Sequence, residues 1–257
     1  MRSIWSGSLS FGLVNIPIKL YVATEEKTIS LDMLHKKDLS PIRYARFCRV
    51  EDKEVPYDEI IKGYEVDKDD YVVVSEDDMK KANVKKTKSI EIMQFVEEEE
   101  IDSMFFEKPY YLEPAKGAEK SYALLLEALK KSKKVGIAKF VLRTRERVAI
   151  VKPRKDALVL DQMRYFQDIR DTKELNLPED TNLKEKEIGM AVAFIEQLTD
   201  KFDPKQFHDT YKNELEKIIE AKSKGETVRV KGKEPVATKA EDLMELLKAS
   251  LEQRAVH

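Results

Sequence analysis

The chain has 257 residues, of which 42% are hydrophobic and 37% are charged, and its 47 Lys or Arg and 49 Asp or Glu give a net charge of −2. The charged fraction is well above the ~25% usual for globular domains, and no apolar run approaches the ~18 residues of a membrane span, so we expect a soluble protein and no membrane partner. The single cysteine, Cys48, excludes an intrachain disulfide and fits a reducing cytoplasm.

Two strands are predicted near the N-terminus. Apolar residues alternate with small or polar ones over residues 9–13 and again over residues 16–20, the period of half-buried strands. The apolar phase slips at Val14–Asn15, where we expect a bulge or a bend. Lys19 falls on the face opposite the apolar side chains. The first fourteen residues lack a continuous apolar segment, so we expect no signal peptide.

A polar, poorly periodic excursion follows at about residues 25–62. Residues 34–50 hold five bases and one acid, and Lys36, Lys37, Arg43 and Arg46 are the basic residues of interest. A long excursion without a helix is uncommon in a compact domain unless it is functional. One arm of it, extended at ~3.3 Å per residue, would reach ~60 Å and could curl over a ligand as wide as a nucleic-acid duplex.

The next segment, residues 51–119, has a net charge of −11 and alternates strands with helices. We expect a short buried strand at 71–74, a helix capped by Ser75 and running to about Lys86, and strands at 89–96 and 108–112. The acids at 97–100 and Asp102 indicate a solvated loop rather than a metal site, since no histidine is placed to complete a ligand set. An amphipathic helix after Gly117 should end near Gly136.

The most basic stretch, residues 130–155, holds eleven Lys or Arg and one acid, a net charge of +10. Two apolar runs inside it predict a hairpin with residues 143–146 at its tip, followed by a third meander strand at 158–165. Arg143, Arg145 and Arg147 lie at or beside the tip. Such a surface either binds a polyanion, most often nucleic acid, or is a solvated face whose charges pair with acids elsewhere.

The chain becomes helical after Phe166. Apolar spacing predicts one helix around residues 188–198 and a second opened by Asp203 and Pro204 and ended by Gly225. Its apolar face carries these residues: Phe207, Tyr211, Leu215 and Ile218. A Lys/Gly/Pro linker follows, and a capping box at Thr238 starts a last short helix. That helix presents an apolar stripe that either packs back on the core or docks another protein: Leu243, Leu246, Leu247 and Leu251.

Catalytic signatures are absent from the sequence. The three histidines have no second His or Cys at metal-ligand spacing, and neither a phosphate-binding loop nor a dinucleotide fingerprint occurs. We therefore predict no enzyme activity, no metal and no cofactor.

Five segments carry a resemblance to a known family. They are IWSGSLSFGLVNIPIKLY at 4–21, YDEIIKGYE at 57–65, KKVGIAKFVLRTRERVAIVKP at 133–153, FDPKQFHDTY at 202–211 and LMELLKASLE at 243–252. They are collinear over nearly the whole chain, and each closely resembles the corresponding segment of bacterial Ku proteins. One departure is Glu51, which stands where many relatives have the second Cys of a C-x-x-C pair begun by Cys48, so we predict no zinc there.

The resemblance implies an α+β fold with three parts. Residues 1–170 would form an antiparallel β-barrel core with the bridge at about 25–62 inserted, residues 171–225 a helical dimerisation arm, and residues 226–257 a linker and ligase-docking helix. It implies a cytoplasmic, nucleoid-associated homodimeric ring that binds double-stranded DNA ends in nonhomologous end joining and recruits an ATP-dependent ligase of the ligase D type.

Two other functions compete with an encircling ring. One is a metal-dependent nuclease that uses the acids between Glu97 and Asp102. The other is a single-strand-binding barrel, for which Tyr44 and Phe47 are the aromatic residues placed among arginines. For the ring, the candidate DNA contacts are these: Lys19, Lys36, Lys37, Arg43, Arg46, Arg143, Arg145 and Arg147.

Overall fold

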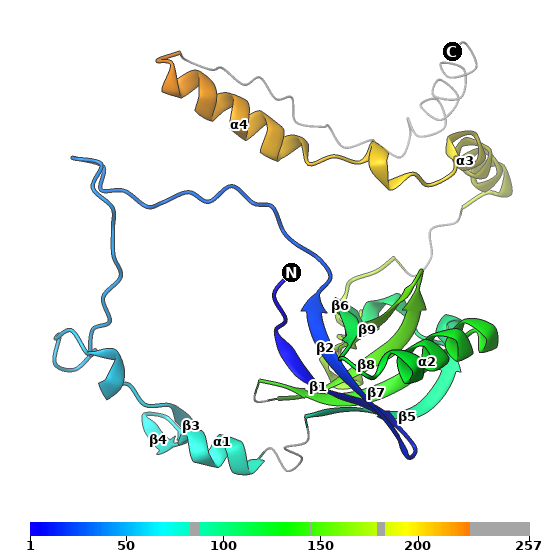
Figure 1. Ribbon diagram of the computed structural model, residues 1–257. Helices are drawn as coiled ribbons and strands as arrows, with labels where there is room; N and C mark the ends of the chain where they lie inside the picture. Colours follow the sequence, from blue (N-terminus) through cyan, green and yellow to red (C-terminus); the bar gives the residue numbers. More distant parts are fainter. Residues whose placement is uncertain (83–87, 144, 179–182, 227–257) are drawn as a thin grey trace. The chain divides into compact units, whose positions relative to one another are not determined.

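The computed structural model describes residues 1–82, 88–143, 145–178 and 183–226 (Figure 1). The chain divides into two compact units, Met1–Glu174 and Leu175–His257. Within the described residues, no helix is both long and apolar enough to cross a membrane.

The first unit is built on a closed barrel of seven strands in the order β1-β2-β6-β9-β8-β7-β5. The strands are β1 Trp5–Phe11, β2 Val14–Val22, β5 Ser89–Glu97, β6 Phe106–Pro114, β7 Lys134–Leu142, β8 Arg145–Arg154 and β9 Ala157–Met163. The predicted barrel is confirmed. The barrel is mixed rather than purely antiparallel, because β1 and β5 pair in parallel and close it.

The phase slip near the N-terminus is a hairpin turn rather than a bulge within one strand. Phe11 pairs with Val14, so β1 and β2 are joined by two residues, and Gly12 has a φ of 55°. Glycine adopts this left-handed conformation without steric cost, which allows the reversal.

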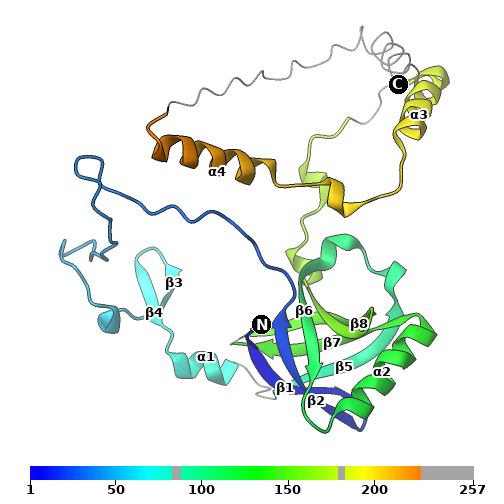
Figure 2. The ribbon, with the colours of Figure 1, turned by 45° about the horizontal axis from the view of Figure 1, so that its top comes forward.

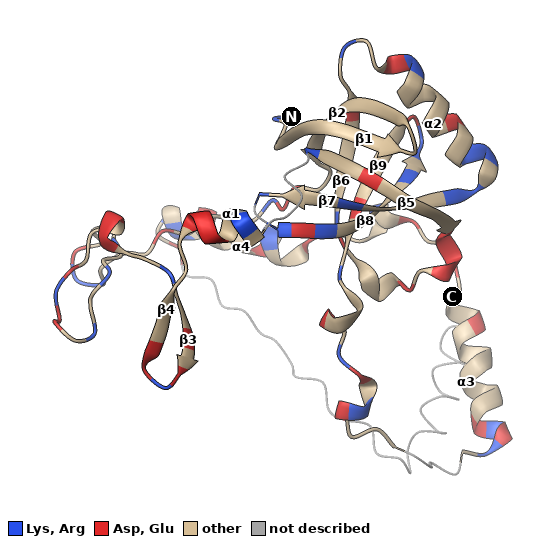
Figure 3. Ribbon diagram, turned by 90° about the horizontal axis from the view of Figure 1, so that it is seen from below, with Lys and Arg blue, Asp and Glu red and all other residues tan. Residues whose placement is uncertain are grey.

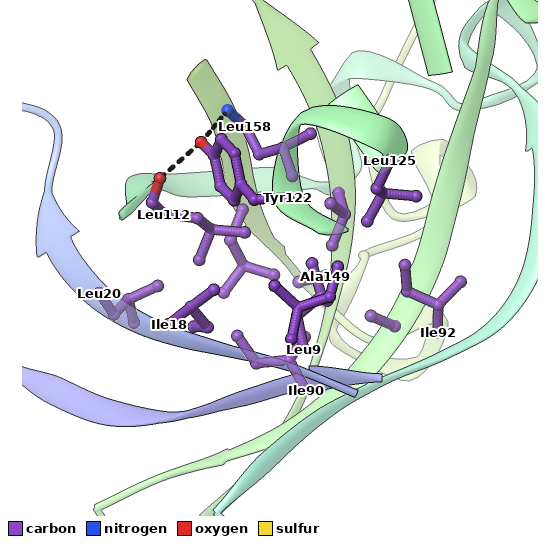
Figure 4. Packing of buried hydrophobic residues seen from close by; sticks show 14 of the residues in the cluster. Leu9, Ile18, Leu20, Ile90, Ile92, Leu112, Tyr122, Leu125, Ala149 and Leu158 are labelled. Carbon is purple, nitrogen blue, oxygen red and sulfur yellow. Dashed lines mark hydrogen bonds between the residues drawn. The ribbon is translucent and has the colours of Figure 1, made fainter. Parts of the chain in front are cut away.

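Side chains from all seven strands and from α2 (Glu119–Ser132) fill the barrel interior. Figure 4 shows how Tyr122 of α2 completes this core. Its buried hydroxyl donates a hydrogen bond of 2.7 Å to the Leu112 carbonyl of β6 and accepts one of 2.7 Å from the Leu158 amide of β9. The hydroxyl therefore satisfies backbone groups of both strands at one end of their ladder.

A second apolar cluster lies on the outer face of β7, β8 and β9. Val135, Ile150 and Met163 are buried there beneath side chains that include Ile101 and Phe105. These two residues come from the segment after β5, which contains the 3₁₀ turns η2 Glu98–Glu100 and η3 Ser103–Phe105. Two more such turns, η4 Phe166–Asp168 and η5 Thr172–Glu174, follow β9.

The excursion was predicted at about residues 25–62; from here on the name covers the whole segment between the end of β2 at Val22 and the start of β5 at Ser89 (Figure 2). It holds η1 Tyr57–Glu59, the hairpin of β3 Gly63–Asp67 and β4 Asp70–Val73, and α1 Glu76–Ala82. The cap expected at Ser75 is confirmed, because its hydroxyl accepts from the Asp78 amide at 3.1 Å. The expectation of a buried strand at 71–74 is wrong. β4 pairs only with β3 in a separate two-stranded sheet, so Val72 remains 53% exposed.

The end predicted for α2 near Gly136 is also wrong. The helix ends at Lys133, which is left-handed with a φ of 54°. Gly136 lies within β7, where a Cβ would approach the Ile92 side chain to 3.0 Å. This glycine is needed for close packing between β7 and β5 and not for a helix cap.

The second unit contains α3 Glu185–Leu198, the 3₁₀ turn η6 Pro204–Gln206 and α4 Thr210–Ser223. The helix expected from Pro204 begins only at Thr210, because Asp203 caps the 3₁₀ turn and Asp209 caps α4 by accepting from the Lys212 amide at 2.9 Å. Neither α3 nor α4 has a buried side chain. The predicted strand at 227–230 and the last helix lie outside the described residues.

Candidate nucleic-acid interface

One end of the barrel brings together segments that are far apart in the sequence. The excursion leaves there after Val22 and returns there before Ser89, because β2 and β5 are neighbours of β1 and have this end in common. The tip of the β7–β8 hairpin lies at the same end, where the first residues of β6 and the last residues of β9 also pair. We call this the excursion end of the barrel.

The tip of the β7–β8 hairpin is confirmed, and it is tighter than predicted. Leu142 pairs with Arg145, so only two residues connect the strands, and Arg143 has a φ of 60°. Arg145 and Arg147 are two residues apart on β8 and share one face of the strand. That face continues through Ala149 into the barrel interior. Figure 3 shows basic residues at this end of β8.

The basic stretch 130–155 divides into paired and free charges. Four of its lysines make ion pairs with acids: Lys130 with Glu127 at 2.9 Å, Lys134 with Glu97 at 2.7 Å, Lys139 with Glu146 at 3.3 Å, and Lys152 with Glu98 at 2.6 Å. The three tip arginines have no ion pair with any described acid. The solvated-face interpretation therefore holds for these four lysines, while binding of a polyanion stays a prediction. Lys131, Lys133, Arg154 and Lys155, at the other end of the strands, also have no ion pair with a described acid.

Lys152 shows why paired lysines are poor candidates for binding. Its ammonium lies 2.6 Å from Glu98, 3.7 Å from Asp161 and 4.9 Å from the centre of the Phe106 ring. Burial raises the pKa of Asp161 above its ordinary value, although the Lys152 charge partly offsets this effect. The cluster fastens the outer face of the barrel to the η2 segment and leaves Lys152 only 21% exposed.

Lys19 lies apart from the other candidate contacts. It projects from the outer face of β2, since Ile18 and Leu20 on either side point into the core. Its cross-strand partner on β6 is Glu113, which accepts a hydrogen bond from Tyr21. This acid opposite Lys19 reduces the local positive potential.

Two of the four basic candidates of the excursion lie in a small loop, and the other two lie between this loop and a second one. Lys36 and Lys37 lie in a loop closed by pairing of Leu34 with Pro41. In that loop the Ser40 hydroxyl and amide hold the pKa of Asp38 below its usual value. Exposed Arg43 precedes the second loop, which is closed by pairing of Phe47 with Glu54.

Arg46 is the most restrained of these candidates. Its guanidinium lies 5.1 Å from the centre of the Tyr57 ring, a cation–π distance. The face of Tyr57 is therefore occupied by an arginine. Tyr44, which is 82% exposed, and Phe47, which is 59% exposed, remain the aromatic side chains near the arginines.

The acid run after β5 serves a structural role in the described structure. Glu97 pairs with Lys134, which holds the pKa of Glu97 below its usual value, and the Glu100 carboxylate accepts from the Glu97 amide at 3.1 Å. Within the described ranges, no group of three or more His, Cys, Asp or Glu residues could hold a metal ion.

Comparison with known proteins identifies the family. Residues 10–190 match a family profile that is described as "Ku70/Ku80 beta-barrel domain". The chain belongs to the Ku family. A non-homologous end joining protein Ku from Opitutus terrae is 43% identical and aligns with 98% of this chain and 92% of its own length. Proteins with the same name from Coxiella burnetii and Bacillus subtilis are each 38% identical over 98% of this chain and 95% and 82% of their own lengths.

The residues predicted for the arm of this Ku protein lie in the second unit. Tyr211, Leu215 and Ile218 lie on α4, and Phe207 lies between η6 and α4, where its ring stacks on Phe202 at 5.8 Å. Phe207 is 72% exposed and Tyr211 is 75% exposed. The residues predicted to dock a ligase lie outside the described residues: Leu243, Leu246, Leu247 and Leu251.

Sequence reasoning missed three basic residues at the excursion end. Lys88 directly precedes β5, Lys108 lies near the start of β6, and Arg2 precedes β1. Lys88 is adjacent to the strand predicted at 89–96 and Lys108 begins the one predicted at 108–112, which was the available signal, whereas Arg2 lies outside every predicted strand. Their convergence depends on strand order, because β1 and β2 lie between β5 and β6 on one side of the closed barrel and β7, β8 and β9 lie between them on the other.

Proposed function

We propose that this protein forms a homodimeric ring that binds double-stranded DNA ends without sequence specificity, protects and bridges them, and recruits an ATP-dependent ligase of the ligase D type for nonhomologous end joining. Membership of the Ku family supports the proposal, as does the name shared by its relatives. The proposal assigns no catalytic step to the protein and places it in the cytoplasm, on the nucleoid.

The observation that carries the DNA-binding proposal is the set of free arginines at the excursion end of the barrel. Arg143, Arg145 and Arg147 lack acidic partners among the described residues, whereas four lysines of the same stretch are paired. Phosphate contacts need cations but no groups that read base edges, so such a surface binds without sequence preference. The excursion begins and ends beside these arginines and can complete an enclosure.

The remaining contacts of the proposal come from the excursion and from β2. They are Lys36, Lys37, Arg43 and Arg46 on the excursion and Lys19 on the barrel. We rank Lys19 below the others, because it faces Glu113 across the strand pair.

Exposed apolar faces in the second unit support dimerisation. In the single chain Ile195 of α3 is 62% exposed and Tyr211 of α4 is 75% exposed. Isolated helices of this length are marginal in water, and a symmetric partner would bury both faces. The arm residues of the proposal are Phe207, Tyr211, Leu215 and Ile218.

The test compares linear duplex with covalently closed circles of the same sequence in a binding titration. A ring that threads onto ends binds the linear duplex and leaves closed circles unbound, whereas a flat basic surface binds both. If 6–10 phosphates are neutralised, affinity should fall by about 10³–10⁵ between ~50 and ~200 mM salt. Equal binding of both forms would refute the ring, and preference for single strands would favour the stacking alternative.

A matched pair of variants tests the role of the free arginines. Arg147→Gln should lower the slope of log affinity against log salt by about 0.9 if Arg147 neutralises one phosphate. Lys120→Gln, on α2, removes the same charge and should leave the slope unchanged. If the two variants behave alike, net charge and not the hairpin tip governs binding.

A further inference from the structure

A cavity opens at the excursion end of the barrel. It has a volume of about 920 Å³ and extends between the N-terminal segment, the start of β6 and the β7–β8 tip. Cavities of about 300–1,000 Å³ commonly hold small molecules, and the mouths of β-barrels are frequent sites. The cavity therefore has the size of a small-molecule site. The opposite end of the β6–β9 ladder is closed by Tyr122.

The walls of this cavity are strongly basic. The charged residues that line it are Arg2, Lys88, Lys108, Arg143, Arg147 and Glu107. The one acid, Glu107, has no ion pair with a described base, and its carboxylate accepts a hydrogen bond of 2.8 Å from the side-chain amide of Gln162. None of the five bases has an ion pair with a described acid. Five positive charges thus face one negative charge around a concave surface, which focuses the field on an anion.

Two aromatic residues, Tyr110 and Trp5, also line the cavity. Tyr110 is 4% exposed, and its hydroxyl has no hydrogen-bond partner among the described residues. The hydroxyl is nevertheless not a buried unsatisfied polar atom, so it reaches solvent-accessible space. The hydroxyl therefore faces the cavity as a donor. Burial raises the pKa of Tyr110, whereas the nearby charges of Arg147 and Arg143 lower it, so the hydroxyl stays protonated at neutral pH.

Trp5 is the second aromatic residue that lines the cavity, and the absence of a side chain at Gly7 makes its position possible. A Cβ at Gly7 would collide with the Trp5 ring and with the Lys88 carbonyl. That carbonyl accepts from the Ser8 amide at 2.9 Å. The absence of a Cβ at Gly7 therefore leaves room for the indole while the Ser8–Lys88 hydrogen bond is kept. An indole beside cationic side chains suits a ligand with both a planar or sugar portion and an anionic portion.

We propose that this barrel-mouth pocket binds a phosphate-bearing ligand of nucleotide size, with Arg147, Arg143 and Lys108 contacting the phosphate groups and the Trp5 indole contacting the remainder. Two sources supply this chemistry: the phosphorylated terminus of a DNA strand, or a free nucleotide or polyphosphate. The first source rests on the proposed DNA-end function, and the second does not.

Trp5 is the one tryptophan of the chain, so intrinsic fluorescence reports on this pocket. Titration of the full chain with inorganic pyrophosphate should give a saturable change in Trp5 emission that weakens with salt. The double variant Lys88→Gln, Lys108→Gln should bind pyrophosphate about tenfold more weakly or worse, because it loses the Lys108 contact and a second positive charge of the cavity wall. The matched control Lys116→Gln, Lys120→Gln, at the α2 end, should bind like the wild type.

A competition experiment separates the two sources of phosphate. Duplexes with a short overhang, with and without a 5′-phosphate, are used to displace pyrophosphate. Stronger displacement by the phosphorylated duplex assigns the pocket to DNA termini, and absent displacement assigns it to free phosphates. Equal displacement by both duplexes refutes recognition of the terminal phosphate. The pocket is refuted if pyrophosphate causes no saturable change, or if the Lys88, Lys108 variant and its control respond alike.

Duplex binding by the same proteins distinguishes failure of the pocket from failure of the proposed function. A wild-type protein that binds linear duplex but gives no response to pyrophosphate refutes the pocket alone. A protein that responds to pyrophosphate but does not bind duplex refutes DNA-end binding and leaves the pocket in place.

Discussion

Removing the Tyr122 hydroxyl should destabilise the barrel by a predictable amount. In Tyr122→Phe the ring keeps its place in the core, but the Leu112 carbonyl and the Leu158 amide each lose a buried hydrogen bond of 2.7 Å. A buried hydrogen bond contributes about 0.5–1.5 kcal/mol net, so the two together give about 1–3 kcal/mol. At about 2–4 °C per kcal/mol for a unit of this size, the melting temperature should fall by roughly 2–12 °C.

Tyr110→Phe is the matched control, because it removes the same atom from another buried ring. Its hydroxyl has no partner among the described residues, so we expect a loss below about 0.5 kcal/mol. Urea titrations followed by Trp5 fluorescence report on the barrel itself, since Trp5 packs against the barrel core. The midpoint should shift for Tyr122→Phe at unchanged m-value. Equal losses in the two variants would refute the role assigned to the Tyr122 hydrogen bonds.

Three other predictions use different measurements. Gly7→Ala should lower the unfolding free energy by about 1–3 kcal/mol and alter the tryptophan emission, because its methyl group meets the indole, whereas Gly189→Ala, with open space around it in α3, should not destabilise. Asp161 has a raised pKa in the folded state, so its stabilising contribution is complete below its ordinary pKa of 3.8 and is lost as pH rises through the folded-state pKa. Over this pH range, the unfolding free energy of Asp161→Asn should therefore rise relative to that of the wild type. A difference in unfolding free energy that does not change with pH would contradict this. Leu246→Asp with Leu247→Asp should leave DNA binding intact and weaken ligase stimulation; unchanged ligation would remove the docking role.

The barrel strands could be predicted because period-two alternation is a strong local signal. Residues 16–20 alternate cleanly, and their apolar members are fully buried in the core. The buried face of α2 could be predicted for the same reason, since Tyr122, Leu125 and Leu129 have helical spacing and are all buried. In both cases the side chains that form the apolar pattern in the sequence are the same ones that are buried in the barrel core.

The errors arose where a local pattern met an unexpected neighbour. Val72 and Val73 look like a core strand, but their strand pairs only within the excursion, so they stay exposed. Gly136 looks like a helix stop, but it is a contact point between β7 and β5. No local pattern distinguishes these uses of valine and glycine, because the difference depends on which distant strand lies alongside.

The candidate site shows the same limit for charge. The net charge of +10 over residues 130–155 is a property of the sequence, but its value for binding depends on which acids the fold brings near. Lys134 and Lys152 meet Glu97 and Glu98 because the segment after β5 crosses the outer face of the barrel.

The tip arginines lie at the other end of the strands from those acids. Arg143 and Arg147 instead line one cavity with Lys88 and Lys108, which are remote in sequence. Strand order around the barrel therefore brings together basic residues that are far apart in a chain of nearly balanced charge. A protein of net charge −2 can in this way bind phosphate without a basic isoelectric point, because the local field and not the total charge acts on the ligand.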